Sequence, residues 1–115
     1  VDKVGMFYQS LQAFDEAVSA YQRVLNSYPD HKTSLHNIAV IAVFGGDLPR
    51  AIEYFTKAIG ADASYLEAYF GRAYTYELLG NLIKSESDYR TSLMLDPAYL
   101  PSIDGLARVD ALKLD

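Results

Sequence analysis

The stretch that decides the fold runs from Leu35 to Asp62 and reads LHNIAVIAVFGGDLPRAIEYFTKAIGAD. Apolar residues recur every three or four positions on both sides of a Gly-Gly-Asp segment, which predicts two amphipathic helices joined by a tight turn. Glycine permits the positive φ of such a turn, Asp47 can cap the second helix, and Pro49 is tolerated in its first turn. The stretch is therefore predicted to form one helical hairpin.

The same pattern returns at a spacing of 34 residues, as YFGRAYTYELLGNLIKSESDYRTSLMLD over 69–96 and as VDKVGMFYQSLQAFDEAVSAYQRVLNSY over 1–28. Small residues, which let two helices approach closely, occupy equivalent positions in successive copies, as do larger residues that can fill the space beside them. This periodicity predicts a repeat array of stacked hairpins. The equivalent sets are Gly5, Ala39, Ala73 and Ala107; Ala17, Ala51 and Ser85; Tyr21, Phe55 and Tyr89; and Leu25, Ile59 and Leu93.

The two ends of the array are less regular. In the first copy we expect a helix over 1–12, a turn at Ala13, Phe14 and Asp15, and a second helix that ends before Pro29. Each unit of a solenoid covers the apolar face of its neighbour, so both ends are expected to be open and to pack on further repeats or on another chain. The predicted organisation is one array: an incomplete first repeat at 1–31, full repeats at 32–65 and 66–99, and the first helix of a further repeat, or a capping helix, at 100–115.

Composition argues against several classes of protein. The chain has no cysteine, which excludes disulfide scaffolds, zinc fingers and thiol chemistry. Its ten Lys and Arg residues are scattered and outnumbered by fifteen Asp and Glu, so nucleic-acid binding is not expected. The longest apolar run, from Ile38 to Phe44, is far shorter than the roughly 20 residues of a membrane helix. We expect no nucleic acid, no membrane insertion and no cofactor, with the cytoplasm as the default compartment.

The sequence offers no pattern that indicates an enzyme. His31 and His36 are five residues apart, which is not the i, i+4 spacing that places two metal ligands on one helical face. Carboxylates such as Asp15 and Glu53 lie on predicted solvent faces, where nothing would desolvate them and shift their pKa for acid or base work. We expect neither a metal site nor a catalytic site.

The period of 34, the small residue in the middle of the first helix, the glycine at the turn, the alanine that opens the second helix and the closing prolines Pro29 and Pro97 together resemble the tetratricopeptide repeat family. The resemblance covers essentially the whole chain, although Ala42 replaces a tyrosine and Ala63 a proline of the family pattern. It implies an all-α solenoid, a right-handed superhelix of antiparallel helix pairs. In such a superhelix the first helices line a concave groove that binds peptides or helices of other proteins.

The resemblance also implies which residues face the groove, and most of them are apolar. Such a groove suits an amphipathic helix or an apolar peptide. Family members that grip acidic chaperone tails carry Lys, Arg and Asn on successive first helices; here only Asn37 fits, and Glu67 would repel a carboxylate. An asparagine ladder along the groove also fails, because Gly71 and Gly105 follow Asn37 at the repeat spacing. The predicted groove residues are Met6, Thr33, His36, Asn37, Val40, Phe44, Phe70 and Tyr74.

Two functions stay open. The first is an interaction module or scaffold that binds a peptide or helix of a partner protein in the apolar groove. The second is a structural segment of a longer solenoid, inside a large assembly or as the non-catalytic part of a multidomain enzyme, in which further repeats or a capping helix cover the same side chains.

Overall fold

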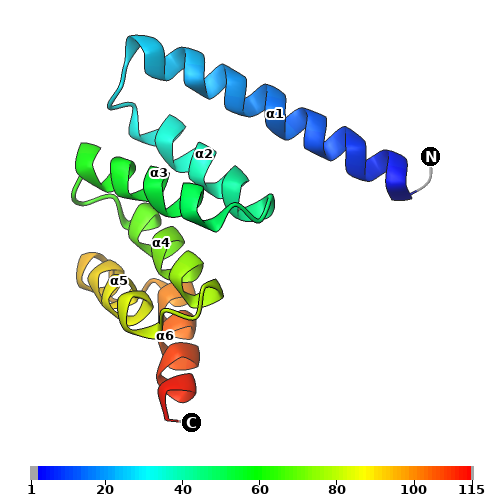
Figure 1. Ribbon diagram of the computed structural model, residues 1–115. Helices are drawn as coiled ribbons and strands as arrows, with labels where there is room; N and C mark the ends of the chain where they lie inside the picture. The colour runs from blue at the N-terminus through cyan, green and yellow to red at the C-terminus, as the bar shows by residue number, and fades with distance from the viewer. Residues whose placement is uncertain (1–2, 115) are drawn as a thin grey trace.

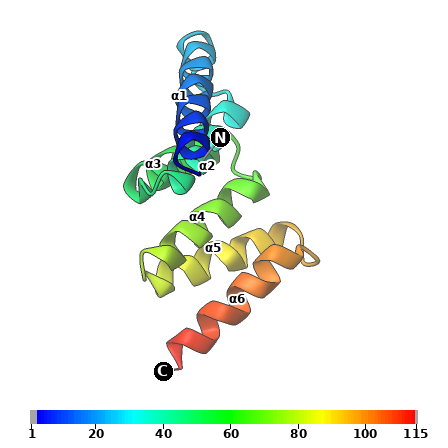
Figure 2. The ribbon, with the colours of Figure 1, turned by 90° about the vertical axis from the view of Figure 1, so that its right-hand side faces the viewer.

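The computed structural model describes the backbone of residues 3–114 and the side chains of residues 12–114. The described backbone forms six α-helices and no strand. Each helix packs against the next along the chain, with further contacts between α2 and α4 and between α4 and α6. Figures 1 and 2 show the resulting stack, which descends from α1 to α6. The helices are α1 (Lys3–Ser27), α2 (Lys32–Phe44), α3 (Leu48–Ala61), α4 (Leu66–Leu78), α5 (Leu82–Leu95) and α6 (Leu100–Lys113).

Two glycines and two side-chain caps make the hairpin turns. Gly46 and Gly80 adopt φ values of 80° and 79°. Glycine adopts this left-handed region without strain, whereas residues with a Cβ are strained there. The next residue in each turn caps the following helix: Asp47 accepts a hydrogen bond from the backbone N–H of Arg50, and Asn81 accepts one from that of Lys84. The predicted turn chemistry of the central hairpin is confirmed.

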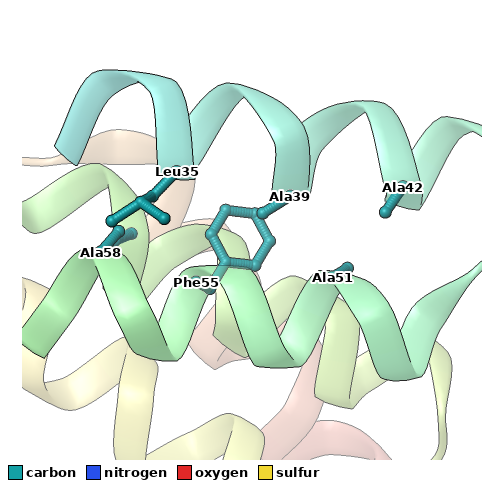
Figure 3. Packing of buried hydrophobic residues seen from close by; sticks show 7 residues of the cluster. Leu35, Ala39, Ala42, Ala51, Phe55 and Ala58 are labelled. Atoms are coloured by element: carbon teal, nitrogen blue, oxygen red, sulfur yellow. The ribbon is translucent and has the colours of Figure 1, made fainter. Parts of the chain in front are cut away.

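The core of the central hairpin has the packing that its small residues predict. Ala39 of α2 and Ala51 of α3 are fully buried in one cluster, and Phe55 fills the space beside them. Figure 3 shows the ring of Phe55 rising from α3 toward Ala39, with Leu35 above Ala58. In the next hairpin Ser85 replaces the alanine, and its hydroxyl donates a hydrogen bond of 2.8 Å to the carbonyl of Ala73. The hydroxyl is thereby satisfied at a close helix crossing.

An ion pair ties the second full hairpin together. Arg72 of α4 donates to both carboxylate oxygens of Asp88 on α5, at 2.7 and 2.9 Å, and a third bond of 3.2 Å reaches Thr56 of α3. Asp88 is only 5% exposed. A buried carboxylate is tolerated when a cation neutralises its charge and donors bond to its oxygens. The Arg72 guanidinium does both through two parallel hydrogen bonds.

The expected turn at Ala13, Phe14 and Asp15 is wrong, because α1 runs without a break from Lys3 to Ser27. Gln12 and Ala13 stand where the other two hairpins have a positive-φ glycine and a capping Asp or Asn. Glutamine and alanine are good helix formers, and neither supplies a left-handed backbone or a side-chain cap. The sequence therefore continues the helix, and Figure 1 shows α1 extending well past the ends of α2 and α3.

Candidate functional site

An apolar pocket with a volume of about 350 Å³ lies between α2 and α4. Phe44 of α2, which is 72% exposed, lines one side of the pocket, and Tyr74 of α4, which is 39% exposed, lines the other. A contiguous group of exposed apolar side chains, unlike a single one, is typical of a surface that another molecule covers. The full lining is His36, Val40, Val43, Phe44, Phe55, Glu67, Phe70, Gly71, Tyr74 and Tyr99.

Of the predicted groove residues, His36, Val40, Phe44, Phe70 and Tyr74 line this pocket. Thr33 is exposed in the first turn of α2 and is not part of the lining. The side chain of Met6 lies outside the described residues.

Asn37 turns away from the pocket toward α1. Its Nδ2 donates a hydrogen bond of 3.1 Å to the hydroxyl of Tyr21. Tyr21 belongs to the recurring aromatic positions, and the structure pairs each of these with the residue 16 positions later. Asn37 is therefore a contact between helices in this structure.

The pairs formed by Phe55 and Tyr89 explain why glycines, Gly71 and Gly105, occupy the repeat position of Asn37 in the later hairpins. A Cβ added to Gly71 would lie 2.4 Å from the ring of Phe55, and one added to Gly105 would lie 2.3 Å from the ring of Tyr89. Glycine is required at both positions because an aromatic ring of the preceding helix occupies the space of a side chain. This arrangement brings the ring of Phe55 to the wall of the pocket.

Tyr65 and Tyr99, which sequence reasoning missed, pack over the two first helices from the linkers. Each is the N-cap residue of the following helix. The Tyr65 ring lies 5.3 Å from that of His36, and the Tyr99 ring lies 5.7 Å from that of Phe70, centroid to centroid. The signal was present, because the two tyrosines are 34 residues apart and each packs on the residue 29 positions before it. Val43 and Phe55 also line the pocket without having been predicted there, whereas Glu67 and Gly71 had been considered at groove positions but left out of the predicted set.

His36 is the titratable base of the pocket. Its ring packs against Phe55 at 5.6 Å and against Tyr65. Burial lowers the pKa of His36 below the usual value of 6.5, although Asn37 and the carboxylate of Glu67 act in the opposite direction. The imidazole is therefore neutral at pH 7, and it fits an apolar surface.

A polar cluster lies beyond the pocket, where α4, α5 and α6 meet. Arg108 donates to both oxygens of Glu77, at 3.0 and 3.1 Å, and the hydroxyl of Tyr89 donates to Glu77 at 2.7 Å. Partial burial raises the pKa of Glu77, but the hydrogen bonds from Arg108 and Tyr89 lower it more, so the net shift is downward. The three side chains satisfy one another.

The described residues contain no group of three or more His, Cys, Asp or Glu side chains that could hold a metal ion. None of the described helices has the length and apolar character needed to cross a membrane.

Comparison with known proteins bears on the fold and the family. Two family models, both described as tetratricopeptide repeat, match residues 2–64 and 36–98. A relative from Oryza sativa subsp. japonica, U-box domain-containing protein 70, is 30% identical over 110 residues, which are 96% of this chain. The chain spans only 14% of the length of that relative.

Several solved structures similar to this chain are tetratricopeptide repeat domains. The first such domain of Spaghetti (RPAP3), bound to the HSP90 peptide SRMEEVD, is 21% identical with a TM-score of 0.87, covering 98% of this chain and 90% of that one. The second domain of human RPAP3, in complex with the HSP70 peptide SGPTIEEVD, is 23% identical with a TM-score of 0.81, covering 92% and 88%. The Arabidopsis OM64 domain is 23% identical with a TM-score of 0.80, covering 91% and 86%. The all-α solenoid of repeated hairpins is thereby confirmed, and the chain belongs to the tetratricopeptide repeat family.

Proposed function

We propose that this chain is a protein-interaction module whose groove takes up the apolar face of a peptide or helix from another protein. The observation that carries this proposal is the apolar pocket between α2 and α4, with Phe44 and Tyr74 exposed at its edges. An aromatic anchor buried at the centre of an interface can contribute about 2 kcal/mol or more to binding. Two such anchors on one pocket would hold a short apolar segment.

The similar solved structures support peptide binding but not the same peptide. The peptides SRMEEVD and SGPTIEEVD in those complexes end in acidic residues. Among the side chains that line the pocket here there is no Lys or Arg, and Glu67 is the acidic one. We expect SRMEEVD to bind this chain no more tightly than its analogue SRMQQVN with an amidated C-terminus, in which the three acidic side chains and the terminal carboxylate are replaced by neutral amides.

Peptide selection tests the proposal without a known partner. Random 16-residue peptides displayed on phage are selected against the chain, and the affinities of the enriched peptides are measured by calorimetry. Phe44→Ser and Tyr74→Ser are expected to weaken binding about tenfold or more. Ile83→Ser is the matched control, because Ile83 on α5 is 76% exposed and lies outside the pocket. No enrichment, or equal weakening by all three substitutions, would overturn the proposal.

Phe70→Ala is a poor test of the pocket. Phe70 packs against the rings of Tyr89 and Tyr99 at 6.0 and 5.7 Å, so its loss disturbs the core of the second hairpin as well. Phe44 and Tyr74 are more exposed, and their truncation separates binding from folding more cleanly.

The alternative, a structural segment of a longer solenoid in an assembly or a multidomain enzyme, is favoured by α6. Leu100, Ile103 and Leu112 are 61, 41 and 50% exposed there, and Ile103 occupies the repeat position of Leu35, which α3 covers. In this alternative residues 100–115 begin a further repeat. Sedimentation analysis separates the cases: self-association that Ile103→Lys abolishes supports a covered end, and a monomer at all concentrations opposes it.

A further inference from the structure

The helices α2, α4 and α6 differ in the charged side chains that they carry at the repeat positions of the pocket residues. At the repeat positions of the pocket residues, α4 has Glu67 and Glu77, and α6 has Asp104 and Arg108. Arg108 is committed to Glu77 through two hydrogen bonds. The pair is neutral, so the remaining charge on this face comes from Glu67 and Asp104.

Glu67 lies at the rim of the pocket, close to its aromatic wall. Burial raises the pKa of Tyr65 and Tyr99, and the negative charge of Glu67 raises both pKa values further. The Glu67 carboxylate is therefore close to both tyrosines, which belong to two different linkers. The side chain is exposed, and no ion pair joins it to another described side chain. Lys32 is a cation close enough to feel the charge of Glu67, but its ammonium is paired with Asp62. A carboxylate without an ion-pair partner of its own therefore borders the apolar pocket.

Asp104 is an exposed carboxylate on the next first helix, α6. It occupies in α6 the repeat position that His36 has in α2 and Phe70 has in α4. It is exposed, and among the side chains that the structure describes it also forms no ion pair. Glu67 lies on α4 and Asp104 on α6, and these two helices contact each other.

We propose that the segment bound in this groove is a basic amphipathic peptide or helix, with its apolar face in the pocket and Lys or Arg side chains facing Glu67 and Asp104. The inference rests on the proposed function and adds the charge of the partner. Exposed carboxylates that have no ion-pair partner of their own attract a basic segment and repel an acidic one. A second copy of this chain is disfavoured as the occupant, because each copy carries a net charge of −5.

Three labelled peptides of identical apolar pattern test the charge. Each is a 16-residue amphipathic helix with Leu and Phe at i, i+3, i+4 and i+7 spacing, and its polar positions are all Lys, all Gln or all Glu. Fluorescence anisotropy gives the dissociation constants at about 50 and 500 mM NaCl, since rim charges are screened at high salt. The variants are Glu67→Gln with Asp104→Asn, and the control Glu53→Gln with Asp15→Asn, which removes the same charge from exposed positions outside the pocket.

At low salt the Lys peptide is expected to bind about tenfold more tightly than the Glu peptide, with the Gln peptide between them. The groove variant is expected to reduce this ratio to about threefold or less, mainly by weakening the Lys peptide, whereas the control variant keeps most of the ratio. Equal affinities for the three peptides, or an equal loss of the ratio in both variants, would overturn the basic partner while leaving apolar binding intact. Failure of all three peptides to bind would overturn the proposal that the bound segment is a basic amphipathic helix. The proposal of an apolar groove is tested separately, by the phage selection.

Discussion

Replacing Gly71 with alanine tests the contact between a first helix and the aromatic ring of the preceding hairpin. The new Cβ would lie 2.4 Å from Cε1 and Cζ of Phe55 and 3.1 Å from Cδ1. Carbon atoms prefer a separation of about 3.5–4.0 Å, so the overlap exceeds about 1 Å. Phe55 is 1% exposed, and its ring cannot move away without leaving the core of the central hairpin.

The magnitude follows from two opposing effects. Alanine is favoured over glycine inside a helix by about 1 kcal/mol. Overpacking a filled core costs about 1–3 kcal/mol, and the depth of this overlap indicates the upper part of that range. We expect a net loss of about 2 kcal/mol in the free energy of unfolding, equivalent to a melting temperature about 8 °C lower for a domain of this size.

Gly60→Ala is the matched control, because a Cβ at Gly60 in α3 meets nothing within 4 Å. It is expected to be neutral or to stabilise by up to about 1 kcal/mol. Both variants are compared by urea denaturation followed by circular dichroism, together with Phe55→Leu and the double variant Phe55→Leu, Gly71→Ala. The smaller leucine should make the Gly71 substitution less costly. The reasoning is refuted if Gly71→Ala stabilises as Gly60→Ala does, or if its cost is the same in both backgrounds.

Two further predictions concern charge, and both are measured by urea denaturation. Arg72→Met leaves the carboxylate of Asp88, 5% exposed, without its cation and should cost about 3 kcal/mol, whereas adding Asp88→Leu should recover much of that loss; no recovery would contradict the buried pair. Burial lowers the pKa of His36 below 6.5, so the unfolded chain takes up this proton first, and stability should fall as the pH drops below about 6.5. His36→Phe, which copies Phe70 at the equivalent repeat position, should remove that part of the pH dependence, and an unchanged profile would show that His36 does not cause it.

The sequence by itself determined the two full hairpins and their spacing, and the family resemblance that it carries supplied half of the residues that line the pocket. Local rules suffice for the two hairpins: apolar residues at helical spacing, a glycine at positive φ and a capping side chain at each turn. The same rules, applied strictly, explain the error in the first copy, because Gln12 and Ala13 provide neither turn element and α1 continues through them. His36, Val40, Phe44, Phe70 and Tyr74 could be assigned to one surface because equivalent positions in stacked repeats face the same way.

Only the tertiary structure decided which of the recurring positions meet each other. The period shows that Tyr21, Phe55 and Tyr89 are equivalent, but their contacts with Asn37, Gly71 and Gly105 depend on how one hairpin is rotated against the next. That rotation is set by the summed packing of many side chains across two hairpins, which no local pattern contains. The same rotation turns Asn37 toward α1, brings Tyr99 over Phe70 from a linker, and leaves Glu67 at the rim of an apolar pocket.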